Sequence, residues 1–185
     1  MAVQVLRDIV PVAMISKLPL VMEVNLAVPA KNVAEFIAYG KANPGKINYG
    51  TGGAGSSTHL PGAWLHYATK TEVTFVHYKS AGEGLPDLYA GRLQATGSTP
   101  TTALAGIKSG KVRGLGVSAP KRSPVFPDIP TIAETVPGYE TNAWGGVITP
   151  AGVPRAIVAK LNAEINRALA APTLRERYAA IDTEP

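Results

Sequence analysis

The sequence contains no cysteine, which excludes a disulfide scaffold, a thiolate zinc site and a cysteine nucleophile. With only three histidines, few other metal ligands are present, and His59 and His66 have no third ligand at a suitable spacing. No apolar run reaches the ~18 residues of a membrane-spanning helix. Residues 1–10 also lack the basic start and small-residue cleavage site of a signal peptide. We therefore expect no metal site, and either a cytosolic protein or an N-terminus that is not the natural one.

The composition is that of a globular protein, with 45% hydrophobic and 17% charged residues in a chain of 185. It excludes intrinsic disorder and fibrous repeats. The 19 glycines and 16 prolines predict short elements and frequent turns. The length fits either one domain or one small lobe with parts of another.

The formal net charge of +5 is concentrated in one acid-free stretch, residues 108–122. Its cations are Lys108, Lys111, Arg113, Lys121 and Arg122. Nucleic-acid tracking surfaces usually interleave aromatic residues with the cations, and this stretch has none. The pattern favours a solvated face beside a site that prefers anions, with no nucleic-acid partner.

The hydrophobic pattern alternates strands with helices for most of the chain. It predicts strands over 9–15, 20–28, 47–49, 73–78, 93–96, 112–117 and 139–148, and helices over 33–42, 60–68, 85–89, 100–107, 157–169 and 174–181. This rhythm predicts an α/β fold with a mostly parallel sheet flanked by helices, in which ligands bind at the carboxyl ends of strands. The proline-rich residues 119–137 and the terminal helix pair indicate a connection to a second lobe.

The strongest local motif is the glycine-rich segment Gly50–Gly55, which matches G-x-G-x-x-G between a strand and a helix. A dinucleotide site also requires an acidic residue at the carboxyl end of the next strand, and Glu72 lies at the wrong end. A Walker loop is excluded because Ser56 stands where lysine is required. A nucleotide-dependent oxidoreductase that uses this loop remains the alternative interpretation.

The same loop has a simpler interpretation as an anion site. Glycines let the backbone approach a ligand, and the start of the following helix presents free N–H groups. Ser56, Ser57 and Thr58 add hydroxyl groups, and His59 lies in the first helical turn, where its ring can donate to an anion. The structural alternative is a turn and a helix cap with no ligand.

Two further strand ends carry small polar residues, Lys79–Gly82 and Gly97–Pro100. Together the three loops predict a donor-rich cup suited to a carboxylate. Ser56 does not lie in a G-x-S-x-G motif, so hydrolysis is poorly supported. Trp144, flanked by glycines on its C-terminal side, is either a hinge packing residue or one wall of a pocket.

Several segments occur in an order that is specific when they are taken together. They are Pro29–Glu35, Pro44–Gly50, Gly53–Ser56 with Thr58–Leu60, Val76–Lys79, Lys108–Arg113, Lys121–Pro124, Pro127–Glu134 and Thr149–Pro154. With these segments the chain resembles, over nearly all of its 185 residues, the Bug-type solute receptors of tripartite tricarboxylate transporters.

The resemblance implies a periplasmic, non-enzymatic receptor with a type II periplasmic-binding-protein fold, whose partners are a small carboxylate solute and the membrane subunits of the transporter. By position, residues 1–17 would be a partial first lobe and hinge strand, 18–136 the complete ligand-binding lobe, and 137–185 the return strand and C-terminal helices of the first lobe. The implied ligand-binding residues are Gly50, Thr51, Gly52, Gly53, Ala54, Gly55, Ser56, Ser57, Thr58, His59, Tyr78, Lys79, Ser80, Gly82, Ser98, Thr99 and Trp144. No cofactor, metal or catalytic residue is implied.

Two departures from the family pattern qualify these expectations. Family members begin with a first-lobe βαβ region that carries its own glycine-rich loop, and they continue past Pro185. Near Gly97 and Ser98 the family often has aspartate. We therefore expect a truncated receptor that lacks its signal peptide, binds carboxylates weakly by itself, and self-associates through apolar surface of the incomplete lobe.

Overall fold

The computed structural model describes residues 4–185, which form two compact units. One unit is Pro19–Ala143, here called the sheet unit. The other, here called the ribbon unit, consists of the described residues up to Leu18 together with Trp144–Pro185. Within residues 4–185, no helix is long and apolar enough to cross a membrane.

The sheet unit alternates strands with helices much as the hydrophobic pattern predicts. Its strands are β2 (Val21–Asn25), β3 (Ile47–Thr51), β4 (Val73–His77), β5 (Ala95–Ser98) and β6 (Val112–Val117). Its helices are α2 (Val33–Ala42), α3 (His59–Thr69), α4 (Leu85–Tyr89) and α5 (Pro100–Lys108), with 3₁₀ turns η1 (Ala81–Gly84) and η2 (Ile132–Glu134). The expected α/β fold with a sheet flanked by helices is confirmed.

The strands form one five-stranded sheet in the order β4-β3-β5-β2-β6. β3 runs parallel to both β4 and β5, whereas β2 is antiparallel to both β5 and β6. The sheet is therefore mixed: four strands share one direction and β2 opposes them. A mostly parallel sheet was the expectation, but alternation along the chain does not reveal that β2 inserts between β5 and β6.

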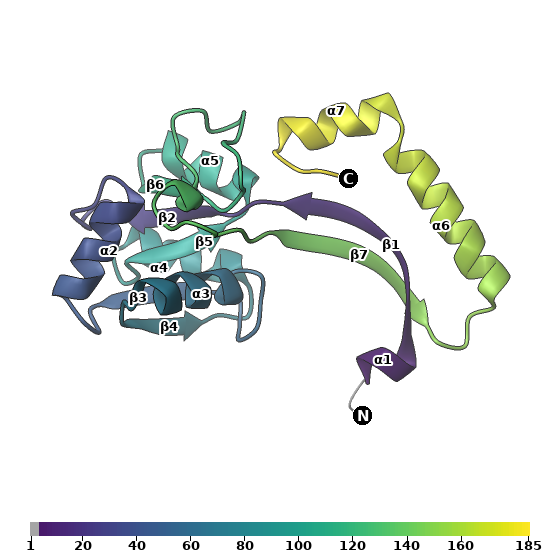
Figure 1. The fold of residues 1–185 in the computed structure, drawn as a ribbon, viewed down its shortest axis with the longest axis horizontal. Coiled ribbons are helices and arrows are strands. Elements are labelled where there is room, and N and C mark those ends of the chain that lie inside the picture. The colour runs from purple at the N-terminus through teal and green to yellow at the C-terminus, as the bar shows by residue number, and fades with distance from the viewer. Residues whose placement is uncertain (1–3) are drawn as a thin grey trace. The chain divides into compact units, whose positions relative to one another are not determined.

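Helices cover both faces of this sheet (Figure 1). On one face, α2 and α3 contribute Phe36 and Leu65 to a core with Ile47 and Leu115 of the strands. The other face is covered by α4 and α5, whose Leu88 and Ala103 pack against the strands. Full burial of a side chain such as Phe36 contributes roughly 1.5–3 kcal/mol, so these two cores hold the strand ends in place.

The start of α2 shows how local sequence sets an element boundary. The side chain of Asn32, the N-cap residue, accepts a hydrogen bond from the backbone N–H of Glu35 at 2.8 Å. The Glu35 carboxylate in turn accepts from the backbone N–H of Lys31. Such a cap contributes about 1 kcal/mol.

The ribbon unit contains a two-stranded sheet of β1 (Ile9–Leu18) and β7 (Ala143–Pro150), which run in opposite directions (Figure 1). Its helices are α1 (Val5–Asp8), α6 (Arg155–Leu169) and α7 (Pro172–Ala180). The amide of Asn162 on α6 donates to the carbonyl of Val12 on β1 at 2.6 Å. The short helix α1 precedes the first predicted strand and was not among the predicted elements.

One carboxylate is buried in the middle of the sheet unit. Glu23 on β2 is 1% exposed, and neither of its oxygens has a hydrogen-bond partner within the described chain. Burial raises the pKa of Glu23 to about 7, because the low-dielectric interior disfavours the charged form; the neighbouring Ser98 hydroxyl opposes this rise in part.

The substitution Glu23→Gln is expected to remove a pH dependence of stability. Because the folded-state pKa exceeds the ordinary value of 4.5, the native state holds an extra proton between these two values. The contribution of Glu23 to the free energy of unfolding should therefore fall as pH rises from 4.5 to about 7, by at most about 3 kcal/mol.

Urea titrations across this pH range measure the free energy of unfolding. As pH rises, the free energy of unfolding of Glu23→Gln should increase relative to that of the parent. Glu72→Gln, at an exposed position before β4, is the matched control and should keep the parental slope. Identical slopes for Glu23→Gln and the parent would refute the assignment.

Candidate functional site

Three polar loops follow β3, β4 and β5, and these strands are adjacent and parallel. The strands end at Thr51, His77 and Ser98. Because the carboxyl ends of parallel neighbours lie at one edge of a sheet, the three loops lie at the same edge. The structure thus brings together the three segments that the sequence singled out.

The loop after β3 is closed by its own hydrogen bonds. The backbone N–H of Gly52 donates to the hydroxyl of Thr58 at 2.9 Å, and Ser56 N–H donates to the carbonyl of Gly53 at 3.2 Å. Gly53 and Gly55 have φ of 114° and 76°, a region that favours glycine. Thr58 is buried, so its hydroxyl shapes the loop from inside.

Two histidines flank this loop with their rings 5.0 Å apart, edge to face. The Gly55 N–H donates to Nδ1 of His59 at 3.0 Å, so a neutral His59 ring carries its proton on Nε2. His77 bonds through Nδ1 to the hydroxyl of Thr51 at 2.6 Å. His59 therefore fixes the loop with one nitrogen and keeps the other as a donor.

Free backbone donors remain on the outer side of the loop. Within the described chain the N–H groups of Ala54 and Ser57 make no hydrogen bond, and both residues are exposed. They precede α3, whose first turn presents the positive end of the helix dipole. The loop is therefore suited to accept an anion.

The loop after β4 contributes its backbone and small side chains. The N–H of Tyr78 donates to the Thr51 carbonyl at 2.9 Å, which ties this loop to the loop after β3. The Tyr78 hydroxyl instead donates to Asp87 at 2.5 Å, and Asp87 is also paired with Arg92. The hydrogen bond from Tyr78, and to a smaller extent the contact with Arg92, holds the pKa of Asp87 below its ordinary value. Lys79, Ser80 and Gly82 are exposed in the same loop.

The predicted contacts after β5 lie in the sheet unit, whereas the predicted tryptophan lies in the ribbon unit. Ser98 is buried at the end of β5, whereas Thr99 is exposed and its hydroxyl lies 3.0 Å from that of Thr102. Trp144 belongs to the ribbon unit, on β7, where 73% of its surface is exposed.

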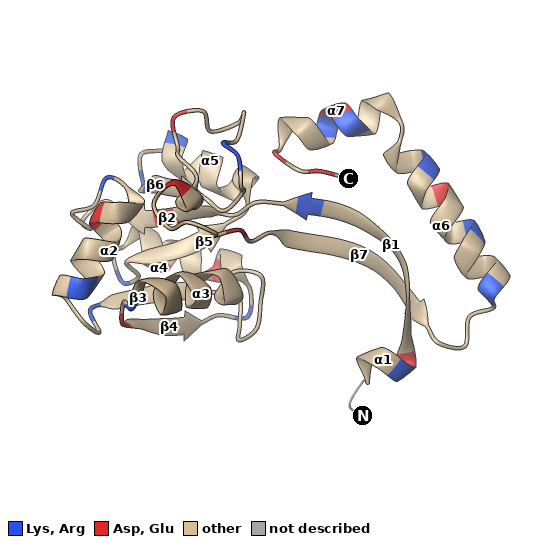
Figure 2. Ribbon diagram, in the orientation of Figure 1, with Lys and Arg blue, Asp and Glu red and all other residues tan. Residues whose placement is uncertain are grey.

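The basic stretch does not form one face beside these loops. Lys108 and Lys111 lie before β6, at the sheet edge opposite to the carboxyl ends of β3 and β5, while Lys121 and Arg122 follow β6. Arg122 pairs with Glu134 at 2.8 Å. Figure 2 shows further cations on α2, α6 and α7, so the positive charge is dispersed.

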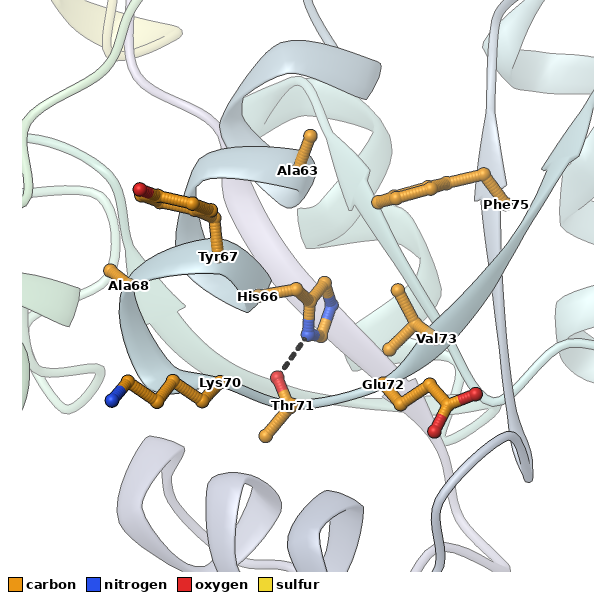
Figure 3. Close-up of a pocket in the computed structure, with 9 residues that line it drawn as sticks. All are labelled: Ala63, His66, Tyr67, Ala68, Lys70, Thr71, Glu72, Val73 and Phe75. Carbon is orange, nitrogen blue, oxygen red and sulfur yellow. Dashed lines mark hydrogen bonds between the residues drawn. The ribbon is translucent and has the colours of Figure 1, made fainter.

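An open cavity of about 680 Å³ lies between the C-terminal half of α3 and the first part of β4 (Figure 3). It includes Glu72 and Val73 at the amino end of β4, away from the three loops. His66 bonds through Nδ1 to the Thr71 hydroxyl at 2.6 Å. Its Nε2 is buried without a partner in the described residues, and burial lowers the pKa of His66 to about 4. Glu72 thus lies at the amino end of β4, opposite to the end where a dinucleotide site would need its carboxylate.

Sequence reasoning missed Glu23 and the pairing of Tyr78 with Asp87. A lone acidic residue inside the apolar run Val21–Asn25 is the signal that points to Glu23. No comparable local signal predicts the Tyr78 contact, because it depends on how α4 packs beside β4.

The layered sheet with three polar loops at the carboxyl strand ends is of the α/β class in which small ligands bind at that edge. The model of the tripartite tricarboxylate transporter family receptor (TctC) matches residues 1–185, and the chain belongs to this family. The expected kinship with Bug-type receptors is confirmed: Protein BugT of Bordetella pertussis is 32% identical over 98% of this chain and 56% of its own length.

Other relatives and solved structures agree. A UPF0065 protein from the tcbD–tcbE intergenic region of Pseudomonas sp. strain P51 is 38% identical over 92% of this chain and 51% of its own length. The structure of Rhodopseudomonas palustris Rpa4515 with adipate superposes with a TM-score of 0.91 at 34% identity, covering 97% of this chain and 60% of that one. MatC of the same organism, with bound malate, gives 0.86 at 30% identity, covering 95% and 60%. The chain thus spans about half the length of the curated relatives it matches.

Gly52 provides a direct test of how the first two loops support each other. A Cβ atom at Gly52 would lie 2.8 Å from the backbone nitrogen of Ala81. We expect Gly52→Ala to push the two loops apart and to lower the free energy of unfolding by about 1–3 kcal/mol. Amide chemical shifts of Gly52–His59 and Lys79–Gly82 should change together.

Gly82→Ala is the matched control, because a Cβ there meets nothing within 4 Å and no positive φ opposes it. It should leave the amides of the loop after β3 unchanged. Equal effects of both variants would show that the close approach at Gly52 does not hold the loops together.

Proposed function

We propose that this chain provides a carboxylate-binding lobe of an extracytoplasmic solute receptor that delivers its ligand to the membrane subunits of a tripartite transporter. The observation that carries the proposal is the cluster of three donor-rich loops at adjacent parallel strand ends. The free N–H groups of Ala54 and Ser57 and the Nε2 of His59 are suited to carboxylate oxygens.

Membership of the receptor family and the ligands named for two relatives support the same class of solute. Rpa4515 was solved with adipate and MatC with malate, both carrying two carboxylates. The function needs no chemical step, so we propose binding without catalysis, in the periplasm. Neither the geometry at Glu72 nor the relatives support the oxidoreductase alternative.

The residues proposed to contact the solute are those that the three loops expose, together with the half-buried His59. They are Ala54, Gly55, Ser57 and His59 after β3, Lys79, Ser80 and Gly82 after β4, and Thr99 after β5. Thr51, Thr58, Tyr78 and Ser98 are proposed to support these loops from within, because each is buried or has its side chain bonded inward. Trp144 stays a proposed contact on the ribbon unit.

A titration of the ¹⁵N-labelled chain with adipate tests this proposal. We expect the amide signals of Ala54–His59 and Lys79–Gly82 to shift, with a dissociation constant weaker than about 1 μM because free donors exposed to water gain little from a ligand. Adipamide, which keeps the chain length but lacks the charge, is the control and should produce much smaller shifts.

Shifts confined to other parts of the sheet unit would overturn the placement of the site. Submicromolar affinity of the isolated chain for adipate or malate would overturn the expectation that it binds weakly. Nicotinamide dinucleotides should leave the loop signals unchanged, and saturable shifts there would revive the nucleotide alternative.

We also propose that the chain self-associates through the ribbon unit. Large apolar side chains are exposed there on both strands and on α6, namely Met14, Trp144, Ile148, Ile157 and Leu161. Exposed apolar surface of this kind favours association, because burying it releases about 25 cal/mol per Å².

Sedimentation velocity over a range of concentrations is the measurement. The parent chain should sediment faster as concentration rises, and the double variant Ile157→Ser with Leu161→Ser should remain closer to a monomer. Leu60→Ser, at an exposed position of the sheet unit, is the control and should behave like the parent. A parent chain that stays strictly monomeric at high concentration would contradict the proposal.

A further inference from the structure

Glu23 lies on the face of β2 that is directed at α4 and α5. Along the strand, Val21 packs against α5 and Asn25 bonds to the carbonyl of Leu88 on α4, and side chains alternate between the two faces. Glu23, between them, therefore shares that face. It is the only charged residue of β2.

The groups around the Glu23 carboxylate are polar but uncharged. A Cβ atom on Gly106 of α5 would lie 3.1 Å from the Glu23 Oε1 and 3.3 Å from the Tyr89 hydroxyl of α4, so both groups border the same glycine. Tyr49 of β3 is a further buried phenol close enough to be affected by this charge. On β5, the neighbouring group is the Ser98 hydroxyl.

Two cations close to or within β6, the strand beside β2, are engaged elsewhere. The Lys111 ammonium lies over the ring of Tyr89, 5.1 Å from its centroid, and Arg113 on β6 donates to the carbonyl of Ala30 at 2.8 Å. Among the described residues, no salt bridge reaches Glu23. A buried carboxylate without a cation is stable mainly in its protonated form.

Ser98 connects Glu23 to the proposed site. It is paired in register with Val21 on β2, so it lies diagonally across from Glu23, which is opposite Thr96. Ser98 is also the last residue of β5, directly before the exposed Thr99 at the start of α5. The Glu23 carboxylate therefore lies close to the point where the third loop begins.

We propose that the buried Glu23 carboxylate acts through space on the neighbouring Ser98 and on the loop after β5, and that its protonation state sets the affinity of this site for an anionic solute. The inference rests on the proposed carboxylate site. When Glu23 is ionised, its charge lies beneath a loop that must accept another negative charge, which disfavours binding. When it is protonated, this repulsion is absent. Affinity should thus fall severalfold as Glu23 loses its proton, and binding near neutral pH should take up a proton.

The link between Glu23 and Ser98 is testable without any ligand. In the ¹³C,¹⁵N-labelled chain, the Glu23 carboxyl carbon and the amides of Ser98 and Thr99 should titrate with one midpoint, near pH 7. Glu23→Gln should remove this midpoint from both amides, whereas Glu72→Gln should keep it. Ser98→Ala should raise the Glu23 midpoint, because the hydroxyl favours the ionised form.

A Glu23 midpoint near 4.5, or Ser98 and Thr99 amides that do not follow it, would overturn the inference. A purely structural role for Glu23 predicts a loss of stability in Glu23→Gln but no common midpoint in the parent chain.

The second arm measures malate binding by amide shifts at about pH 6 and about pH 8. The parent should bind about as tightly as Glu23→Gln at the lower pH and severalfold more weakly than this variant at the higher pH, so that the comparison at each pH isolates the charge on Glu23. Equal affinity of the parent and this variant at the higher pH would overturn the effect on affinity. Absence of malate binding at either pH would count against the proposed function, while the titration without ligand would still decide the link between Glu23 and Ser98.

Discussion

The pairing of β2 with β5 on one side and β6 on the other is the constraint on which the sheet unit depends. All five residues of β2 are buried, and its antiparallel register places Val21 opposite both Ser98 and Val117. β6 can lie close to its covering elements because it carries glycines: a Cβ at Gly114 would lie 2.6 Å from an Ile129 methyl. Backbone pairing therefore fixes the positions of the strand ends, and these positions determine where the loops that follow them lie.

This close packing leaves two ionisable groups buried on opposite faces of the sheet, with opposite effects of pH. Burial raises the pKa of Glu23 to about 7 and lowers that of His66 to about 4. Between 4.5 and 6.5, the folded state holds a proton on Glu23 that the unfolded state lacks, and lacks one on His66 that the unfolded state holds. Their contributions to the pH dependence therefore cancel in that interval. Stability falls below it through His66 and above it through Glu23.

The sequence predicts the helices and strands better than it predicts which strands are adjacent in the sheet. The helices predicted over 33–42 and 60–68 and the strand predicted over 112–117 follow from local patterns, and the structure confirms them. The position of β2 within the sheet does not, because the pairing of distant strands leaves no local trace. The same limit applies to the site: glycines and hydroxyls mark the three loops, but only the fold shows that the Tyr78 hydroxyl is directed to Asp87 and that Ser98 is buried.

Some hydrogen-bonding groups of the loop after β3 fix its conformation, and others are exposed and available to a ligand. Gly52 and Gly55 donate inward, to Thr58 and His59, and these bonds hold the loop in one conformation before any ligand arrives. The outward N–H groups are exposed, and a hydrogen bond that replaces one to water contributes only about 0.5–1.5 kcal/mol. Strong binding of a carboxylate therefore requires a second surface that removes water from these donors, since the same hydrogen bonds are much stronger in a low-dielectric environment. A preformed loop with few exposed donors is thus suited to weak, reversible binding of a carboxylate until such a surface covers it.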